Sequence, residues 1–275
     1  ITTVYNRAYI LNELYESLVR QSSKNFEWIV IDDGSTDDTW TLLKKYKNDE
    51  SLFSITIEKQ ENQGKHVAVN QAVALAKGEF AFIVDSDDYL SDDAVEVICS
   101  WIEQVKERND VAAVAGLCGK KETKEQLGQY PESVKAGDWI EAKNTERRKY
   151  RLLGDKAEVY RTELLRRYPF PKFEGEKFLS EESVWNQLAM EGYLIRWYNQ
   201  IIYWCEYLPD GLTQCAEKEI RNFEGFTYII RQRIRCLGKI EGLFARGLYW
   251  EIAKIKGIGF REAAKRIDTS CVLLG

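Results

Sequence analysis

The chain has 275 residues, of which 44% are hydrophobic, and this is enough apolar material for the core of a globular protein. Its net charge of −5 makes the protein as a whole a poor nucleic-acid binder. The sequence shows neither an uncharged apolar stretch of bilayer length nor an N-terminal secretory signal, so we expect a cytoplasmic protein. Because Ile1 lies in an apparent strand, we also expect that preceding residues are missing.

Strands and helices are predicted to alternate along the first 115 residues. Short apolar runs predict strands at 1–5, 28–31, 53–57, 80–84 and 111–115. Apolar residues at helical spacing predict helices between them, at 10–18, up to about 46, at 67–76 and at 92–108. This alternation favours an α/β fold with a mostly parallel sheet and helices on both faces.

The pattern changes after residue 115. Charges, glycines and Pro131 interrupt residues 116–151, which we interpret as a long excursion beside the active face. A helix is predicted at 181–191, and the aromatic stretch 197–207 follows it.

From residue 220 onward the chain is predicted to be helical. One apolar stripe is expected along it, formed by Phe223, Phe226, Ile230, Ile234, Leu237 and Ile240. Residues 221–266 contain eleven Lys or Arg and four Glu, a net charge of +7. This composition predicts peripheral contact with an anionic membrane, at its inner face. Periodicity equally allows these helices to pack on the domain or against another copy, as a homodimer.

Acidic residues follow two of the predicted strands. Asp85-Ser86-Asp87-Asp88 comes directly after 80–84, and Asp32-Asp33 ends the strand at 28–31. Since ligands of open α/β sheets bind beyond the carboxyl ends of the strands, these carboxyls are expected to share one cleft. Crowded carboxylates are stabilised by a hard cation, Mn²⁺ or Mg²⁺. The alternative is a solvated acidic turn that caps the next helix.

Five motifs occur in register over the first 115 residues. They are Thr3-Val4-Tyr5-Asn6-Arg7, Val30-Ile31-Asp32-Asp33-Gly34-Ser35-Thr36-Asp37, Asn62-Gln63-Gly64-Lys65 with Asn70, Ala76-Lys77-Gly78-Glu79, and Asp85-Ser86-Asp87-Asp88. With them the chain resembles the family 2 inverting nucleotide-sugar glycosyltransferases, which have the GT-A (Rossmann-like) fold. The resemblance is weaker around Glu181-Glu182 and ends after about Thr213.

The resemblance implies a domain division and a set of donor contacts. A GT-A domain would occupy 1–215, with a nucleotide-binding half at 1–115 and an acceptor-side half at 116–215, and a helical extension would occupy 216–275. The implied metal ligands are Asp87 and Asp88. The implied nucleotide and donor contacts are Thr3, Tyr5, Asn6, Asp32, Asp33, Lys65, Asp85 and Ser86.

Individual roles also follow from the resemblance. Asp32 or Asp33 is expected to accept the imide N–H of a uracil base that Thr3 and Tyr5 flank. An Asx turn leading into a helix would explain the same Asp-Asp-Gly-Ser sequence. Lys65 is expected to reach the diphosphate or the edge of the base, with an ordinary surface lysine as the alternative.

Inverting transfer needs a general base, which family 2 commonly takes from a Glu-Asp pair that opens a helix. Here the matching pair is Glu181-Glu182, and the register favours Glu182. Alternatively, Ser180 caps the helix and both acids only favour its positive end. Asp210-Gly211 and Thr213 resemble a turn that closes over the diphosphate.

The predicted function is metal-dependent inverting transfer of a sugar from a UDP-linked donor to a hydroxyl of a glycan or lipid-linked saccharide, as in cell-surface polysaccharide synthesis. A sugar-phosphate nucleotidylyltransferase would use a Gly-rich phosphate loop near its N-terminus, but residues 3–7 contain no glycine. A catalytically inactive GT-A protein that binds glycans or acts as a scaffold is the non-enzymatic alternative.

Overall fold

The computed structural model describes residues 1–49, 53–205 and 217–269. Nine strands lie within these residues: β1 (Thr2–Val4), β2 (Glu27–Asp32), β3 (Ser54–Lys59), β4 (Phe80–Phe82), β5 (Tyr89–Leu90), β6 (Val111–Lys120), β7 (Trp139–Ala142), β8 (Lys156–Arg161) and β9 (Leu194–Cys205). The helices are α1 (Leu11–Val19), α2 (Thr39–Asn48), α3 (Lys65–Leu75), α4 (Ala94–Val105), the short 3₁₀ helix η1 (Asn144–Glu146), α5 (Thr162–Arg167), α6 (Glu182–Met190), α7 (Lys218–Arg221), α8 (Phe223–Cys236), α9 (Lys239–Ile255) and α10 (Phe260–Arg266).

The strands form one continuous, mostly parallel surface. β1, β2 and β3 pair in parallel, and the second set has the order β4-β8-β6-β9-β5, with β7 on β9. Ile1 joins the sets: its nitrogen donates to Phe82 O at 2.8 Å, and its carbonyl accepts from Val84 N at 2.9 Å, a parallel pattern. β1, β2, β3, β4, β6 and β9 therefore run in one direction, against β5, β7 and β8. The predicted sheet is confirmed.

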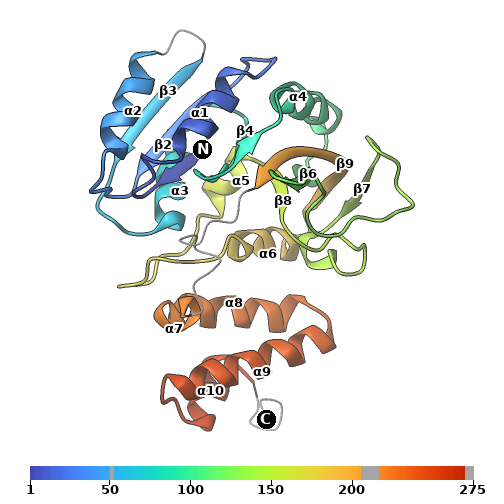
Figure 1. Ribbon diagram of the computed structural model, residues 1–275. Coiled ribbons are helices and arrows are strands. Elements are labelled where there is room, and N and C mark those ends of the chain that lie inside the picture. Colours follow the sequence, from blue (N-terminus) through green and yellow to red (C-terminus); the bar gives the residue numbers. More distant parts are fainter. Residues whose placement is uncertain (50–52, 206–216, 270–275) are drawn as a thin grey trace.

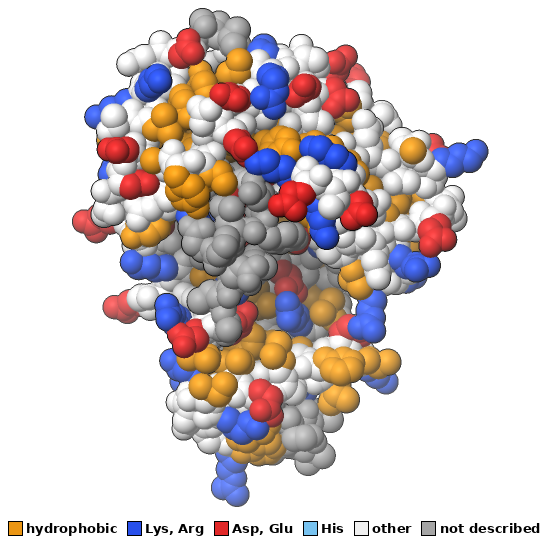
Figure 2. Space-filling model, in the orientation of Figure 1, with side chains coloured by type: hydrophobic (Ala, Val, Ile, Leu, Met, Phe, Trp, Pro, Cys, Tyr) orange, Lys and Arg blue, Asp and Glu red, His pale blue; other side chains and the backbone are white. Residues whose placement is uncertain are grey.

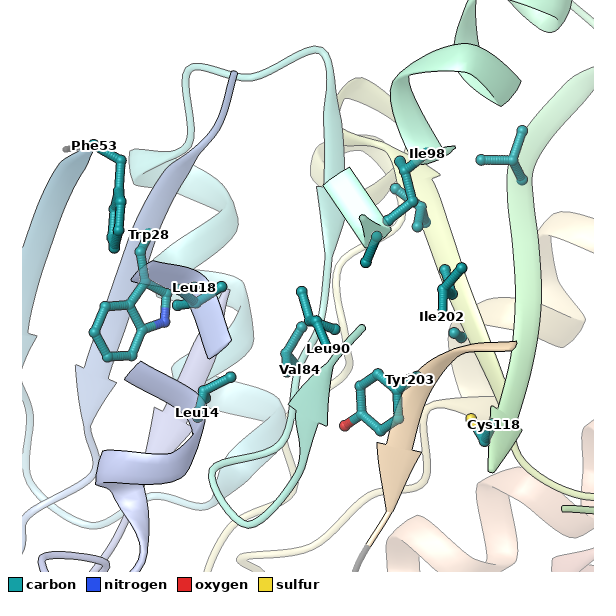
Figure 3. Packing of buried hydrophobic residues seen from close by; sticks show 14 of the residues in the cluster. Leu14, Leu18, Trp28, Phe53, Val84, Leu90, Ile98, Cys118, Ile202 and Tyr203 are labelled. Atoms are coloured by element: carbon teal, nitrogen blue, oxygen red, sulfur yellow. The ribbon is translucent and has the colours of Figure 1, made fainter. Parts of the chain in front are cut away.

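Helices cover both faces of this sheet (Figure 1). Alternation along β2 sends Trp28 and Val30 toward α1 and α2, and Ile29 and Ile31 toward α3. The first of these clusters continues across the sheet to α4 and β9, and Ile98 and Ile202 are among its members there (Figure 3). The rigid sheet fixes the loops at its carboxyl edge.

The expectation of an excursion beginning at residue 116 is wrong in its first part, because β6 continues to Lys120. Gly116 and Gly119 suggested a break, yet they lie inside the strand. A Cβ at Gly116 would lie 2.7 Å from Ile202, and one at Gly119 would lie 2.5 Å from Trp204. The glycines therefore permit close approach of β9 side chains.

The C-terminal helices share a core of their own. Tyr249 and Ala253 of α9 pack with Phe223 and Ile230 of α8 and with α10, and α6 lies between this group and the sheet (Figure 1). The predicted single stripe through Ile240 is wrong. α8 ends at Cys236, Leu237 is extended, and the Ile240 side chain is 65% exposed.

Two further expectations concern residues that the structure does not describe. The predicted turn at Asp210-Gly211 and Thr213, like the proposed division between 215 and 216, lies outside them. No helix in the described ranges is both long and apolar enough to cross a bilayer.

Candidate active site

A cleft of about 1710 Å³ opens at the carboxyl edge of the sheet. It extends from the ends of β1, β2 and β4 to the first turn of α6 and the start of α9. Most of the predicted site residues line it: Thr3, Tyr5, Asn6, Asp33, Lys65, Asp85, Ser86, Asp87, Asp88, Glu181 and Glu182. The fold thus brings the acidic strand ends together with the Glu pair.

Asp32 is the predicted residue that does not line this cleft. Its side chain is fully buried, Oδ1 accepts from Ser35 N at 2.7 Å, and Oδ2 lies 3.4 Å from Lys59 Nζ. The carboxylate therefore closes the turn after β2, as in the Asx-turn alternative. Asn6, in the loop after β1, supports the same turn. Its φ is positive, at 53°, and its side-chain oxygen accepts from Thr36 N at 2.8 Å.

Asp33 anchors the loop that precedes α3. Its Oδ1 accepts from Gln63 N at 2.8 Å and from Gln60 Nε2 at 2.6 Å, and its Oδ2 accepts from Gly64 N at 2.8 Å. Gly64 has a φ of 96°, and a Cβ there would lie 1.9 Å from the Lys177 carbonyl oxygen. Only glycine suits this position, which fixes where α3 and its first residue, Lys65, begin.

Lys65 connects the two acidic parts of the cleft. Its Nζ lies 2.6 Å from Asp85 Oδ1 and 2.8 Å from Glu181 Oε1. Burial alone would lower the pKa of Lys65, but the two carboxylates outweigh it and raise that pKa. Burial likewise would raise the pKa of Glu181, but Lys65 outweighs this effect and lowers it. Lys65 and Glu181 therefore both carry charge at neutral pH.

Tyr203 of β9 fixes the acidic turn after β4, a role that sequence reasoning missed. Its hydroxyl accepts from Asp85 N at 3.0 Å and donates to Asp88 Oδ2 at 2.7 Å. Burial, with Asp88 nearby, raises the pKa of Tyr203 well above its usual value, so the hydroxyl keeps its proton. The only sequence signal was the aromatic stretch at the end of β9.

Asp87 fits a divalent metal better than its neighbours do. Asp85 is paired with Lys65 and Asp88 accepts from Tyr203, whereas burial, followed by the charge of Asp85, raises the pKa of Asp87. No group of three or more His, Cys, Asp or Glu within the described ranges could hold a metal by itself. Mg²⁺ usually binds one or two carboxylates together with substrate phosphates, and Asp87 is compatible with that arrangement.

Glu182 is held from the C-terminal helices. Its Oε2 lies 2.6 Å from Arg233 Nη2, its Oε1 lies 2.9 Å from Arg233 Nε, and Asn186 Nδ2 donates to Oε1 at 2.9 Å. Arg233 thus binds the carboxylate with two nitrogens. Asn186, the second hydrogen-bond partner of Glu182, lies one turn further along α6.

A second residue that sequence reasoning missed is Glu158 of β8. It lines the cleft, its side chain is 13% exposed, and Arg147 Nη1 lies 3.8 Å from Oε1. Burial, only partly offset by Arg147, raises the pKa of Glu158 to about 7. No sequence motif marks Glu158, because it lies within an ordinary strand. Only its position in the cleft identifies it.

Comparison with known proteins adds the family. Residues 1–172 match the model of the glycosyl transferase family 2. The chain belongs to this family. The match covers every predicted donor and metal residue and ends before the Glu pair that begins α6.

Relatives of this family 2 chain match it over part of their length. A poly(ribitol-phosphate) beta-glucosyltransferase of Bacillus spizizenii is 34% identical over 122 residues, which is 43% of this chain and 19% of that protein. The chain therefore spans about a fifth of the length of this relative.

Solved structures show the same fold. S. aureus TarS 1–349 in complex with UDP-GlcNAc has a TM-score of 0.65 at 19% identity and covers 92% of this chain and 71% of that one. The mannosyltransferase PcManGT from Pyrobaculum calidifontis, in complex with GDP-Man and Mn²⁺, has a TM-score of 0.58 at 20% identity and covers 99% and 72%. The predicted GT-A architecture of this family 2 chain is confirmed.

Proposed function

We propose that this protein is a metal-dependent inverting glycosyltransferase that moves a sugar from a UDP-linked donor to a hydroxyl of a glycan or lipid-linked saccharide. The observation that carries the proposal is the single cleft that joins Asp33, the acidic turn after β4 and the Glu pair of α6. The relatives named for transfer to poly(ribitol-phosphate) support an acceptor of the cell-surface polysaccharide class.

The donor binds at the carboxyl edge of the sheet in this proposal. Asp33 accepts the imide N–H of the base, and Thr3 and Tyr5 lie on either side of it. All three line the cleft, and Asp33 N donates to the carbonyl of Val4, which lies between Thr3 and Tyr5, at 2.8 Å. Lys65 faces the diphosphate with a charge that its carboxylate partners maintain. Asp87 would hold a divalent ion, which would supply positive charge against the phosphates of the leaving group.

Transfer occurs in one displacement. The acceptor oxygen forms a bond to the anomeric carbon while the bond from that carbon to the diphosphate oxygen breaks, which inverts the configuration. Glu182 takes the proton of the acceptor hydroxyl, since it lines the cleft as a paired, oriented carboxylate. Glu181 is the second candidate for this role, although its pair with Lys65 directs it toward the donor side.

The alternatives differ in what they predict. A nucleotidylyltransferase would form a nucleotide sugar rather than consume one, and membership of a glycosyl transferase family opposes it. An inactive scaffold has no need of the ordered carboxylates of the cleft.

Peripheral contact at the inner membrane face is the further part of this proposal. α9 carries exposed apolar side chains, and apolar atoms gather over the C-terminal helices (Figure 2). These residues are Ile240, Leu243, Phe244, Leu248 and Ile255. With the net charge of +7 over 221–266, this face matches an anionic lipid surface, and a homodimer is the competing occupant.

The test measures melting temperature and turnover with nucleotide sugars. We expect UDP to raise the melting temperature in Mn²⁺ or Mg²⁺ but not in EDTA, and a screen of UDP- and GDP-sugars to identify one that is turned over. Equal stabilisation in EDTA would remove the metal from the proposal, and absence of turnover with every sugar would favour the scaffold.

Asp87→Asn tests the metal ligand. We expect turnover to fall about 100-fold or more with an unchanged melting temperature, because a metal contributes several kcal/mol to leaving-group stabilisation. Asp138→Asn, an exposed Asp outside the cleft, is the matched control and should retain activity. An active Asp87→Asn variant would assign the metal to another side chain.

A further inference from the structure

We infer that Arg233, on the C-terminal helix α8, is a positioning residue for sugar transfer: it orients the Glu182 carboxylate toward the acceptor hydroxyl. The inference rests on the proposed function, in which Glu182 is the general base. It makes the C-terminal helices a working part of the active site rather than an appended unit.

The contact between the two side chains is geometrically specific. Nε and Nη2 of Arg233 lie 2.9 and 2.6 Å from Oε1 and Oε2 of Glu182, which is a parallel, two-point pair. The guanidinium is planar and rigid, so such a pair fixes the plane of the carboxylate as well as its position. Hydrogen bonding to Glu182 raises the pKa of Arg233, so the cation persists at every working pH.

The remaining contacts of Glu182 leave room for a substrate. Asn186 Nδ2 and Arg233 Nε each donate to Oε1 at 2.9 Å, whereas Oε2 accepts from Arg233 Nη2 at 2.6 Å and from Nε at 3.2 Å. Nε is thus shared between the two oxygens, and its longer contact with Oε2 is the one that a hydroxyl proton of the acceptor would replace. Glu182 also lines the cleft, so a base and its orienting partner are both in place.

α8 supports the whole segment that leads into α6. Near its start, the Glu176 carboxylate accepts from Glu224 N at 2.7 Å and from Gly225 N at 2.8 Å. Further along the helix, Gln232 Nε2 donates to Ser183 O at 2.8 Å. Arg233 follows Gln232, so its pair with Glu182 continues an interface that already fixes the backbone.

Asn222, just before α8, completes this interface. Its Oδ1 accepts from Lys177 N at 2.9 Å and from Phe178 N at 3.0 Å. Since the backbone is held at these other points, removing the Arg233 side chain should disturb Glu182 without unfolding α6. This separation makes the inference testable.

The test compares Arg233→Ala, Arg233→Lys and the control Arg235→Ala in the full chain. Arg235 is 65% exposed on the same helix, pairs with Asp268 and does not line the cleft. The assay follows release of nucleoside diphosphate, with water as acceptor, from the nucleotide sugar that the screen identifies. Melting temperature and UDP affinity in Mn²⁺ are measured for each variant.

We expect Arg233→Ala to lower kcat about 10- to 100-fold, as losing the orienting partner of a functional ligand does, with a KM for the donor within about twofold of wild type. Arg233→Lys should regain part of kcat, and millimolar guanidinium should partly rescue Arg233→Ala. Arg235→Ala should match wild type in all readouts.

Failure of the inference and failure of the proposed function would give different results. An active wild type with an Arg233→Ala variant of unchanged kcat overturns the inference and leaves the proposed function intact. The inference is also overturned if the variant loses donor affinity and kcat together without guanidinium rescue. A wild type that turns over no nucleotide sugar contradicts the proposed function, and the inference with it.

Discussion

Gly64→Ala tests how the loop before α3 is fixed, and Gly192→Ala, just after α6, is its comparison. Gly64 and Gly192 have φ values of 96° and 98°, and both values disfavour a residue with a Cβ. At Gly64 that Cβ would lie 1.9 Å from the Lys177 carbonyl oxygen, whereas at Gly192 nothing lies within 4 Å. A positive φ costs alanine roughly 1–2 kcal/mol. Gly64, with its ψ of 157°, also lies in a region that glycine alone commonly occupies.

The steric term applies only to Gly64→Ala. Overpacking costs about 1–3 kcal/mol, so Gly64→Ala should lose about 2–5 kcal/mol of unfolding free energy, against about 1–2 kcal/mol for Gly192→Ala. Urea denaturation followed by tryptophan fluorescence measures both, and isothermal titration with UDP and Mn²⁺ measures the donor site. Only Gly64→Ala should also weaken UDP binding, because Asp33 and Lys65 flank it. Equal losses in the two variants would refute this account of the loop.

Two further predictions concern the carboxyl and the hydroxyl that sequence reasoning missed. Burial raises the pKa of Glu158 from 4.5 to about 7, so its ionisation in the folded state costs roughly 3 kcal/mol. The unfolding free energy of the wild type should therefore fall as the pH rises through this range. In urea denaturation, Glu158→Gln should show a smaller fall over the same pH range. A stability difference between the two proteins that is the same at pH 5 and pH 8 would contradict it. Tyr203→Phe leaves Asp88 and the Asp85 N–H without the hydroxyl, and should cost about 1–3 kcal/mol in thermal unfolding and weaken donor binding. A variant that binds UDP like wild type would show that the turn keeps its shape unaided.

The sequence predicted the first half of the fold well. Each predicted strand and helix between residues 1 and 115 is present within a few residues of its expected ends, because short apolar runs and helical spacing determine buried strands and covering helices. β6 was predicted too short because Gly116 and Gly119 permit close packing within a strand, and a single sequence does not distinguish this use from a break.

The sequence predicted which residues form the candidate site but not which side chains pair with one another. The acidic strand ends and the Glu pair do meet in one cleft, as the parallel arrangement requires. That Asp32 closes its own turn while Asp33 faces the cleft depends on the path of a few backbone atoms. The partners Tyr203 and Arg233 lie 115 and 51 positions from Asp88 and Glu182, and such distances are set by tertiary packing.

The contacts of α8 with the first turn of α6 have a consequence for engineered chimeras. The family match ends at residue 172, so a graft of this portion alone would carry the proposed donor residues but neither glutamate. A graft extended through α6 alone would include Glu182 without its Arg233 partner. A chimera that exchanges the proposed acceptor side therefore needs α6 and α8 together.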